Sequence, residues 1–139
     1  MYMKQISIFI QDEKGKLADI CFLLGKEGIN IRGFSIADTA EGYGIFRVLT
    51  NDPERTVELL AKAGFTVSEN DILAVKVPDE PGGLSKVLMI FSDNNLSVEY
   101  LYATAGTLIA FKLDHNERAV QALKKANIEI IERSDFLSM

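Results

Sequence analysis

Apolar and polar residues follow two periods along this chain. Gln5 to Ile10 alternates as a half-buried strand does, whereas Lys16 to Glu27 repeats its apolar residues at helical spacing and stops at Gly28. Asp52 and Pro53 suit the cap and the first position of another helix. In chain order, the pattern predicts strands at 29–37 and 44–50, a helix from 53 to about 64, strands at 65–68 and 72–77, a helix at 82–93, strands at 96–104 and 107–113, a helix at 116–126 and a last strand at 128–132.

The pattern of the first half returns in the second half. The turn Asp12–Leu17 aligns with the turn Asp79–Leu84 at an offset of 67 positions, and both turns join a strand to an apolar helix. After a gap the offset becomes 63, where Glu54–Val57 meets Glu117–Val120. Matches at two consistent offsets indicate an internal duplication. The second copy is expected to have lost four residues between its second and third strands.

Each copy is predicted to fold as β-α-β-β-α-β, with the first copy at residues 1–70 and the second at 71–139. This order is typical of the α+β ferredoxin-like sandwich, in which two helices cover one face of a four-stranded antiparallel sheet. Copies of about 70 residues are near the lower limit for an independent core, so the two copies are expected to support one another.

Composition and charge narrow the function classes. The 139 residues carry a net charge of −5, which disfavours nonspecific nucleic-acid binding. No apolar run is long enough to span a membrane and no secretory signal pattern is visible. Cys21 is the single cysteine, so no disulfide framework is expected and a reducing, cytoplasmic location is predicted. Small molecules or proteins are the expected partners.

The residues of the turn resemble a known family. A unit of this size with Pro81-Gly82-Gly83-Leu84 at its first strand-to-helix turn, together with Gly28-Ile29-Asn30-Ile31 at the start of a second strand, is similar to the ACT domain. The resemblance covers the chain as two tandem copies. It implies a regulatory module that binds a free amino acid, without a cofactor, and that acts on an enzyme of amino-acid metabolism. Lys14 replaces the proline in the first copy, and Ser97 replaces the asparagine in the second.

The resemblance also implies how the copies pack. In a ferredoxin-like sheet the second strand lies at an edge, and the segments 29–37 and 96–104 are both apolar enough to pair. We therefore expect the two copies side by side in one eight-stranded antiparallel sheet, with four helices on one face. Homodimerisation of whole chains through the helices or the open sheet face is also compatible with the sequence.

The turns have a physical reason to bind an amino acid. The first N–H groups of a helix lack intrahelical acceptors, so a carboxylate docks there readily, and the two glycines of the second turn are expected to leave the approach open. The ligand's ammonium needs an acceptor such as Asp12, Asp79 or Asn30. From the residues alone, these glycines could equally form a tight turn without a ligand.

The candidate ligand-binding residues come from both turns and both second strands. They are Asp12, Glu13, Gly15, Lys16, Leu17, Asn30 and Ile31 in the first copy, and Asp79, Glu80, Gly82, Gly83, Leu84, Ser97 and Val98 in the second. Edge pairing would join each turn to the second strand of the other copy. The combination of 79–84 with Asn30 is then expected to bind more strongly than the combination of 12–17 with Ser97.

Other candidates for chemistry are weaker. Cys21 is predicted to be a buried structural thiol, and His115 a surface residue that cannot build a zinc site alone. Tyr100 and Tyr102 share one strand face and are expected to pack rather than to line a pocket. With no nucleophile–base pair, metal cluster or nucleotide motif, an enzyme is the minority interpretation. Two hypotheses stay open beside it: an amino-acid sensor, or a ligand-free assembly module.

Overall fold

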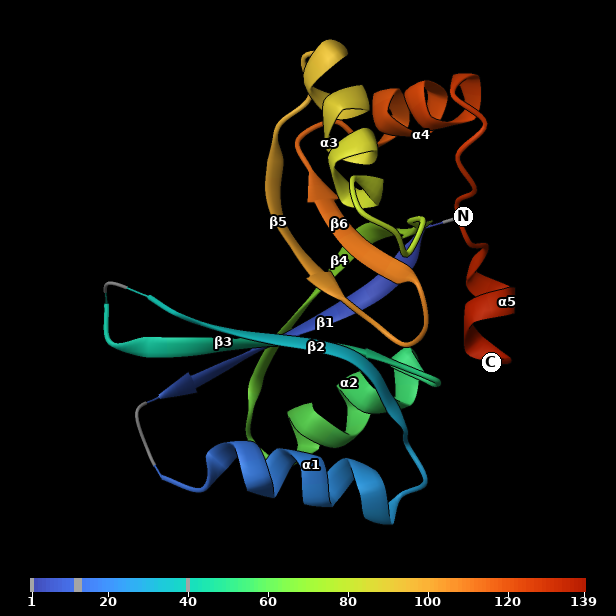
Figure 1. Ribbon diagram of the computed structural model, residues 1–139. Helices are drawn as coiled ribbons and strands as arrows, with labels where there is room; N and C mark the ends of the chain where they lie inside the picture. The colour runs from blue at the N-terminus through green and yellow to red at the C-terminus, as the bar shows by residue number, and fades with distance from the viewer. Residues whose placement is uncertain (1, 12–13, 40) are drawn as a thin grey trace. The chain divides into compact units, whose positions relative to one another are not determined.

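The computed structural model describes residues 2–11, 14–39 and 41–139 (Figure 1). The chain divides into two compact units. The N-terminal unit comprises Lys4–Asn70 with Ser138, and the C-terminal unit comprises Asp71–Leu137 with Tyr2, Met3 and Met139. In the described residues, no helix is long and apolar enough to cross a membrane.

The N-terminal unit is a sandwich of helices on an antiparallel sheet. Its elements are β1 (Met3–Gln11), α1 (Lys16–Lys26), β2 (Ile31–Asp38), β3 (Tyr43–Thr50), α2 (Pro53–Lys62) and the first part of β4 (Thr66–Lys76). The strands lie in the order β2-β3-β1-β4. Ile20, Leu24 and Leu60 of the helices are fully buried in one cluster with Ile6 and Ile8 of β1, so both helices cover the same face of the sheet. Asp52 caps α2 as predicted, since its carboxylate accepts the Arg55 N–H at 3.2 Å.

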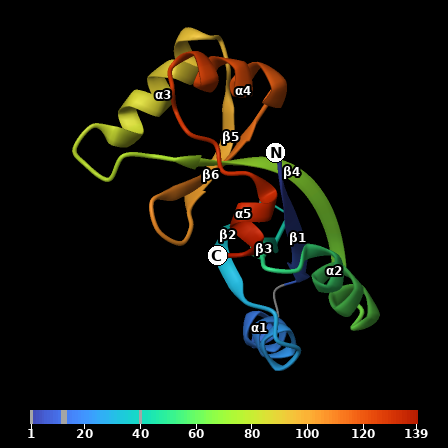
Figure 2. The same cartoon turned by 90° about the vertical axis from the view of Figure 1, so that its right-hand side faces the viewer.

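The C-terminal unit repeats this sandwich. Its elements are the rest of β4, α3 (Gly83–Asp93), β5 (Val98–Ala103), β6 (Leu108–Leu113), α4 (Asn116–Lys125) and α5 (Arg133–Leu137), with the strands in the order β4-β6-β5. Helices α3 and α4 lie side by side (Figures 1 and 2). Phe91 of α3 packs edge-on against Phe111 of β6, with the ring centroids 5.2 Å apart, at the centre of a buried apolar cluster.

The prediction of eight strands and four helices is wrong, because the described residues form six strands and five helices. The strands predicted at 65–68 and 72–77 are one strand, β4, which is hydrogen-bonded to β1 on one side and to β6 on the other. The strand predicted at 128–132 reduces to one bridge between Ile130 and Val75, and the short helix α5 follows it. The described residues pair β2 only with β3 and β5 only with β6, so no ladder joins the two predicted edge strands.

The duplication is visible in the backbone. Gly15 and Gly82 precede α1 and α3 with φ values of 89° and 84°. Two further left-handed positions follow the helices, where glycine in the N-terminal unit is matched by asparagine in the C-terminal unit. These pairs are Gly28 with Asn95 (φ 77° and 55°) and Gly64 with Asn127 (φ 93° and 59°). Asparagine tolerates this conformation better than other non-glycine residues, so the geometry persists although the residue type has changed.

The missing four residues lie inside strands rather than in a loop. The hairpin turn has the same length in both units: Thr39 N–H and Oγ1 both bond to Tyr43 O, and Thr104 N–H and Oγ1 both bond to Leu108 O. Strands β2 and β3 have 8 residues each, whereas β5 and β6 have 6 each. Losing two residues from each strand preserves which face every side chain points to, because side chains alternate with a period of two.

Candidate ligand-binding site

The turns before α1 and α3 have the geometry expected of anion sites. In both turns the left-handed glycine accepts the first helical hydrogen bond, from Asp19 N–H to Gly15 O at 2.9 Å and from Lys86 N–H to Gly82 O at 3.0 Å. Neither helix has a side-chain cap. The N–H groups of the first turn therefore point out of the helix with no intrahelical acceptor, and they carry the positive end of the helix dipole.

Gly83 does not keep the second turn open to a ligand. A Cβ atom at Gly83 would lie 2.0 Å from the carbonyl oxygen of Pro78, and the Gly83 N–H already donates to Glu80 O at 2.9 Å. Gly83 is also buried. Its lack of a side chain is needed for close packing of the helix start on the preceding segment. The role of Gly83 in ligand binding stays a prediction.

A pocket lies beside the turn of the N-terminal unit, and we call it the α1 pocket. It has a volume of about 440 Å³. Its walls come from the end of β1, the start of α1 and the β2–β3 hairpin. The lining residues are Ile10, Gln11, Lys14, Gly15, Lys16, Leu17, Ile36, Asp38, Thr39, Gly42, Tyr43 and Gly44. Three predicted residues thus line it, namely Gly15, Lys16 and Leu17.

Strand register explains how the hairpin reaches the turn. Gly44 of β3 is opposite Ile10 of β1 on one side and opposite Asp38 of β2 on the other. The carboxylate of Asp38 therefore lies two strands away from the turn, at the same end of the sheet. Gly44 has no side chain to fill the space between them, and the nearest atoms to a Cβ there would be 3.8 Å to 3.9 Å away. Asp38, Ile36 and Tyr43 are not among the residues predicted from the sequence, although the expected hairpin ends at the same end of the sheet as the turn.

Charged groups surround the α1 pocket. Lys14 and Lys16 lie at the start of α1, and Asp38 lies across the pocket from them. The Lys16 Nζ is 5.7 Å from the centroid of the Phe65 ring, a cation–π distance, and Phe65 lines a neighbouring pocket that Lys16 also borders. Apolar groups of Ile10 and Ile36 complete the walls. The pocket therefore presents cations, a carboxylate and an apolar surface together.

The matching positions of the C-terminal unit lack these charges. At the offsets of 67 and 65 fixed by the two turns and the two hairpins, Lys14 corresponds to Pro81, Lys16 to Gly83, Asp38 to Ala103 and Tyr43 to Leu108. Asp79 lines a different groove of about 400 Å³ with Lys76 and Lys86, and Glu80 is exposed. Asp12 and Glu13 lie outside the described residues.

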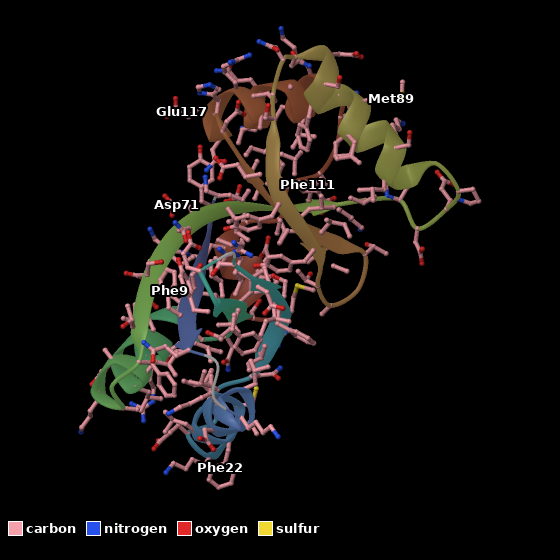
Figure 3. The ribbon with its side chains drawn as sticks, turned by 90° about the vertical axis from the view of Figure 1, so that its left-hand side faces the viewer. Phe9, Phe22, Asp71, Met89, Phe111 and Glu117 are labelled. Carbon is pink, nitrogen blue, oxygen red and sulfur yellow. The ribbon has the colours of Figure 1, made fainter. Side chains whose placement is uncertain are left out.

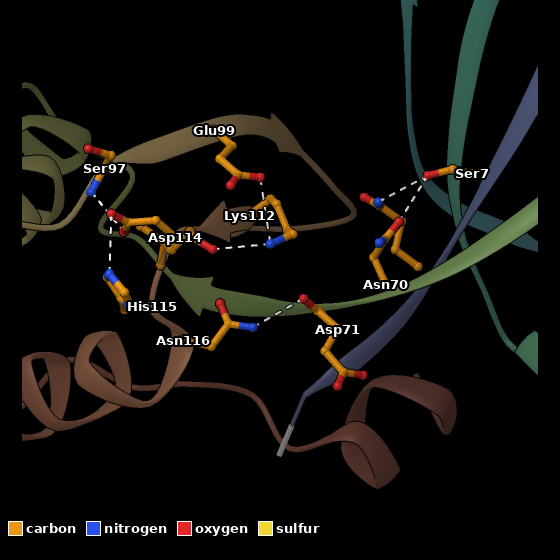
Figure 4. A network of polar contacts seen from close by, with 11 residues as sticks. Ser7, Asn70, Asp71, Ser97, Glu99, Lys112, Asp114, His115 and Asn116 are labelled. Carbon is orange, nitrogen blue, oxygen red and sulfur yellow. Dashed lines mark hydrogen bonds and ion pairs between the residues drawn. The ribbon is translucent and has the colours of Figure 1, made fainter.

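Asn30 and Ser97 hold equivalent positions in their own units. The Asn30 N–H donates to Asn51 Oδ1 at 2.9 Å, and the Ser97 N–H donates to Asp114 Oδ1 at 3.0 Å (Figure 4). In return, the Asn51 and Asp114 N–H groups donate to the backbone oxygens of Asn30 and Ser97, both at 3.2 Å. In each unit, two of these hydrogen bonds therefore connect the start of the second strand to the segment just before the following helix. Neither residue lines the α1 pocket, and the next residues, Ile31 and Val98, pack against the cores of their units.

The Ser97 bond has an electrostatic consequence. The Ser97 N–H, with a smaller contribution from nearby His115, lowers the pKa of the Asp114 carboxyl below its ordinary value, against the opposing effect of desolvation. A lowered folded-state pKa contributes stability above the unfolded-state pKa, and that stability is lost as the pH falls through the folded-state pKa. Asp114→Asn is therefore expected to reduce the melting temperature at neutral pH, with a difference from the parent that shrinks on acidification. Thermal unfolding followed by circular dichroism across this range checks it. A difference that is independent of pH would contradict the assignment.

Cys21, which the sequence predicted to be buried, lies on the surface of α1. Cys21 is exposed, so the prediction of a buried thiol is wrong: Ile20 and Leu24 fill the core-facing stripe of α1, and Cys21 lies beside that stripe. Partial burial still raises the pKa of the Cys21 thiol, which disfavours the reactive thiolate.

Tyr100 and Tyr102 stack on each other, with ring centroids 6.5 Å apart. Among the described residues, no group of three or more histidine, cysteine, aspartate or glutamate side chains could hold a metal ion.

Comparison with known proteins agrees with this duplicated fold. The family model described as an ACT domain pair matches residues 1–139. The solved structure of protein BT0572 from Bacteroides thetaiotaomicron is similar at a TM-score of 0.92 and 29% identity, covering 100% of this chain and 98% of that one. No curated protein matches the chain.

Two regulatory subunits of aspartate kinase share the fold at lower identity. The subunit from Thermus thermophilus, in a ligand-free form, has a TM-score of 0.63 and 18% identity, and the subunit from Thermus flavus has a TM-score of 0.59 and 19% identity. Each comparison covers 88% of this chain and 91% of the other. Because the family model spans every residue, the chain belongs to the ACT domain pair family of regulatory modules.

Proposed function

We propose that this protein is an amino-acid sensor that binds a free amino acid in the α1 pocket and regulates an enzyme of amino-acid metabolism. The observation that supports the proposal is the lining of the pocket, which combines Lys14, Lys16 and the start of α1 with the Asp38 carboxylate of the β2–β3 hairpin. A zwitterion carries the complementary pair of charges. Membership of a regulatory family supports this function over catalysis.

The lining of the α1 pocket offers a complementary group to the carboxylate, the ammonium and the side chain of an amino acid. The ligand carboxylate would accept the N–H groups of Leu17 and Ala18, in the positive potential of Lys14 and Lys16. The ligand ammonium would donate to the Asp38 carboxylate. The ligand side chain would contact the apolar surface of Ile10, Ile36 and Leu17.

This assignment reverses the ranking of the two turns that the sequence favoured. The lack of a side chain at Gly83 allows close packing on Pro78 and does not open the turn to a ligand. Ala103 replaces Asp38 in the C-terminal unit. The turn at Gly82 therefore lacks a counterpart of the Asp38 carboxylate on its hairpin. We propose that it binds an amino acid more weakly than the α1 pocket does.

A thermal-shift screen against the twenty common amino acids tests the sensor function. A ligand at 100 times its dissociation constant stabilises the folded state by about 2.7 kcal/mol, which raises the melting temperature by several degrees. We expect one or a few amino acids to give a saturable rise, and their N-acetyl derivatives, which lack the ammonium charge, to give none. A flat profile for all twenty would overturn the proposal.

A ligand-free assembly module is the second candidate, and a specific feature favours it. Strand β2 carries exposed Phe34 and Ile36, which form an apolar groove of about 310 Å³ with Leu17, Cys21 and residues of the core. Apolar surface beside a sheet edge is typical of association sites. A flat amino-acid screen combined with self-association that Phe34→Ser abolishes would favour this function.

A further inference from the structure

The outer face of α1 carries an apolar residue between two opposite charges. Asp19, Phe22 and Lys26 follow the spacing i, i+3, i+7, which places them along one side of the helix. All three are exposed, and Phe22 is 72% exposed. Phe22 points away from the ribbon (Figure 3). The Phe22 ring therefore lies largely outside the core of its own unit, between two side chains of opposite charge.

The equivalent face of α3 has the same layout with the charges exchanged. Lys86, Met89 and Asp93 occupy the positions of Asp19, Phe22 and Lys26 at the offset of 67. Met89 is 60% exposed and points outward in the same way (Figure 3). Both helices have 11 residues, so the charges recur at the same heights along the two axes.

The charge order on α3 opposes its own helix dipole. Lys86 lies near the positive N-terminus and Asp93 at the negative C-terminus, whereas Asp19 and Lys26 on α1 lie at the ends that favour them. Within the described residues, none of these four side chains forms an ion pair. The order on α3 is therefore unfavourable for the isolated unit, and an external partner of opposite pattern would compensate for it.

We propose that the chain self-associates by packing the α1 outer face of one copy, in parallel, against the α3 outer face of a second copy. This alignment places Asp19 opposite Lys86 and Lys26 opposite Asp93. It also places the Phe22 ring level with the Met89 thioether, and sulfur–aromatic contacts are favourable. The contact lies on the outer helix faces, so it is independent of the α1 pocket and of the groove beside β2.

Charge reversal of one face at a time tests the contact. Sedimentation equilibrium would compare the parent with Lys86→Glu/Asp93→Lys, which we expect to weaken self-association on the order of 10- to 100-fold. This variant aligns the α3 charges with the helix dipole, so loss of folding cannot explain the weakening. The matched control is Glu58→Lys/Lys62→Glu, which reverses an exposed pair on α2 at unchanged net charge and is expected to associate like the parent.

Complementation distinguishes this contact from a pairing of identical faces. The α1 reversal Asp19→Lys/Lys26→Glu alone should also weaken association, but mixing it with the α3 reversal should restore a mixed assembly, because both contacts are then complementary again. If instead α1 paired with α1, or α3 with α3, in antiparallel orientation, each acidic residue would face the basic residue of the identical helix. Reversing both charges of one face would keep these pairs, so the single-face variants would associate like the parent. Undiminished association of the single-face variants would overturn the proposal, and so would a parent protein that stays monomeric at all concentrations.

Discussion

Asp38→Asn is expected to weaken amino-acid binding by about 10- to 100-fold, because a hydrogen bond to a charged group is worth roughly 1.5 to 3 kcal/mol. Asp38 is the carboxylate that lines the α1 pocket, and asparagine has the same shape without the charge. The side chain is exposed, so the fold should tolerate the change. Isothermal titration calorimetry with the amino acid that gives the largest thermal shift measures the loss.

The control for this variant comes from the other unit. Asp79→Asn removes an exposed carboxylate beside the second turn, which belongs to the combination that the sequence predicts to bind more strongly. We expect Asp79→Asn to change the affinity by less than about twofold. Equal losses for the two variants, or a larger loss for Asp79→Asn, would contradict the assignment of the site to the N-terminal unit.

Gly83→Ala is expected to destabilise the C-terminal unit by about 3 kcal/mol. The added methyl group would lie 2.0 Å from the Pro78 backbone oxygen, so the backbone itself must shift, and overpacking of this kind typically costs about 1–3 kcal/mol or more. Urea unfolding followed by circular dichroism gives the change in the free energy of unfolding.

Gly25→Ala provides the matched control for the glycine prediction. Gly25 lies inside α1 with no atom within 4 Å of a built Cβ, and its backbone is not left-handed. Alanine there should stabilise the protein by roughly 0.5 to 1 kcal/mol, through helix propensity and reduced entropy of the unfolded chain. A cost below about 1 kcal/mol for Gly83→Ala would show that Gly83 is not required for packing.

The sequence predicts the repeated unit well because periodicity and capping are local. The four predicted helices, the hairpins and the cap at Asp52 depend on residues close in the chain, and all of them form where expected, whereas the short helix α5 was not predicted. The duplication is recognisable from matched turns even where Gly28 has become Asn95. Local agreement at several levels is typical of sequences that specify one fold.

The features that the sequence did not predict depend on residues that are distant in the chain. Whether 65–68 and 72–77 form one strand depends on the partners on either side of β4, and periodicity does not contain that information. The role of Gly83 depends on the approach of Pro78. Asp38 reaches the turn only through the register of three strands, so a motif centred on the turn could not identify it.

Nuclear magnetic resonance would locate the amino acid that we propose to bind beside α1. Backbone amide signals of uniformly labelled protein would be followed while the best amino acid of the thermal screen is added. We expect the largest chemical-shift changes at Leu17, Ala18, Asp38 and Gly42. Changes centred instead on Leu84 and Ser85, with the α1 signals unmoved, would contradict this expectation.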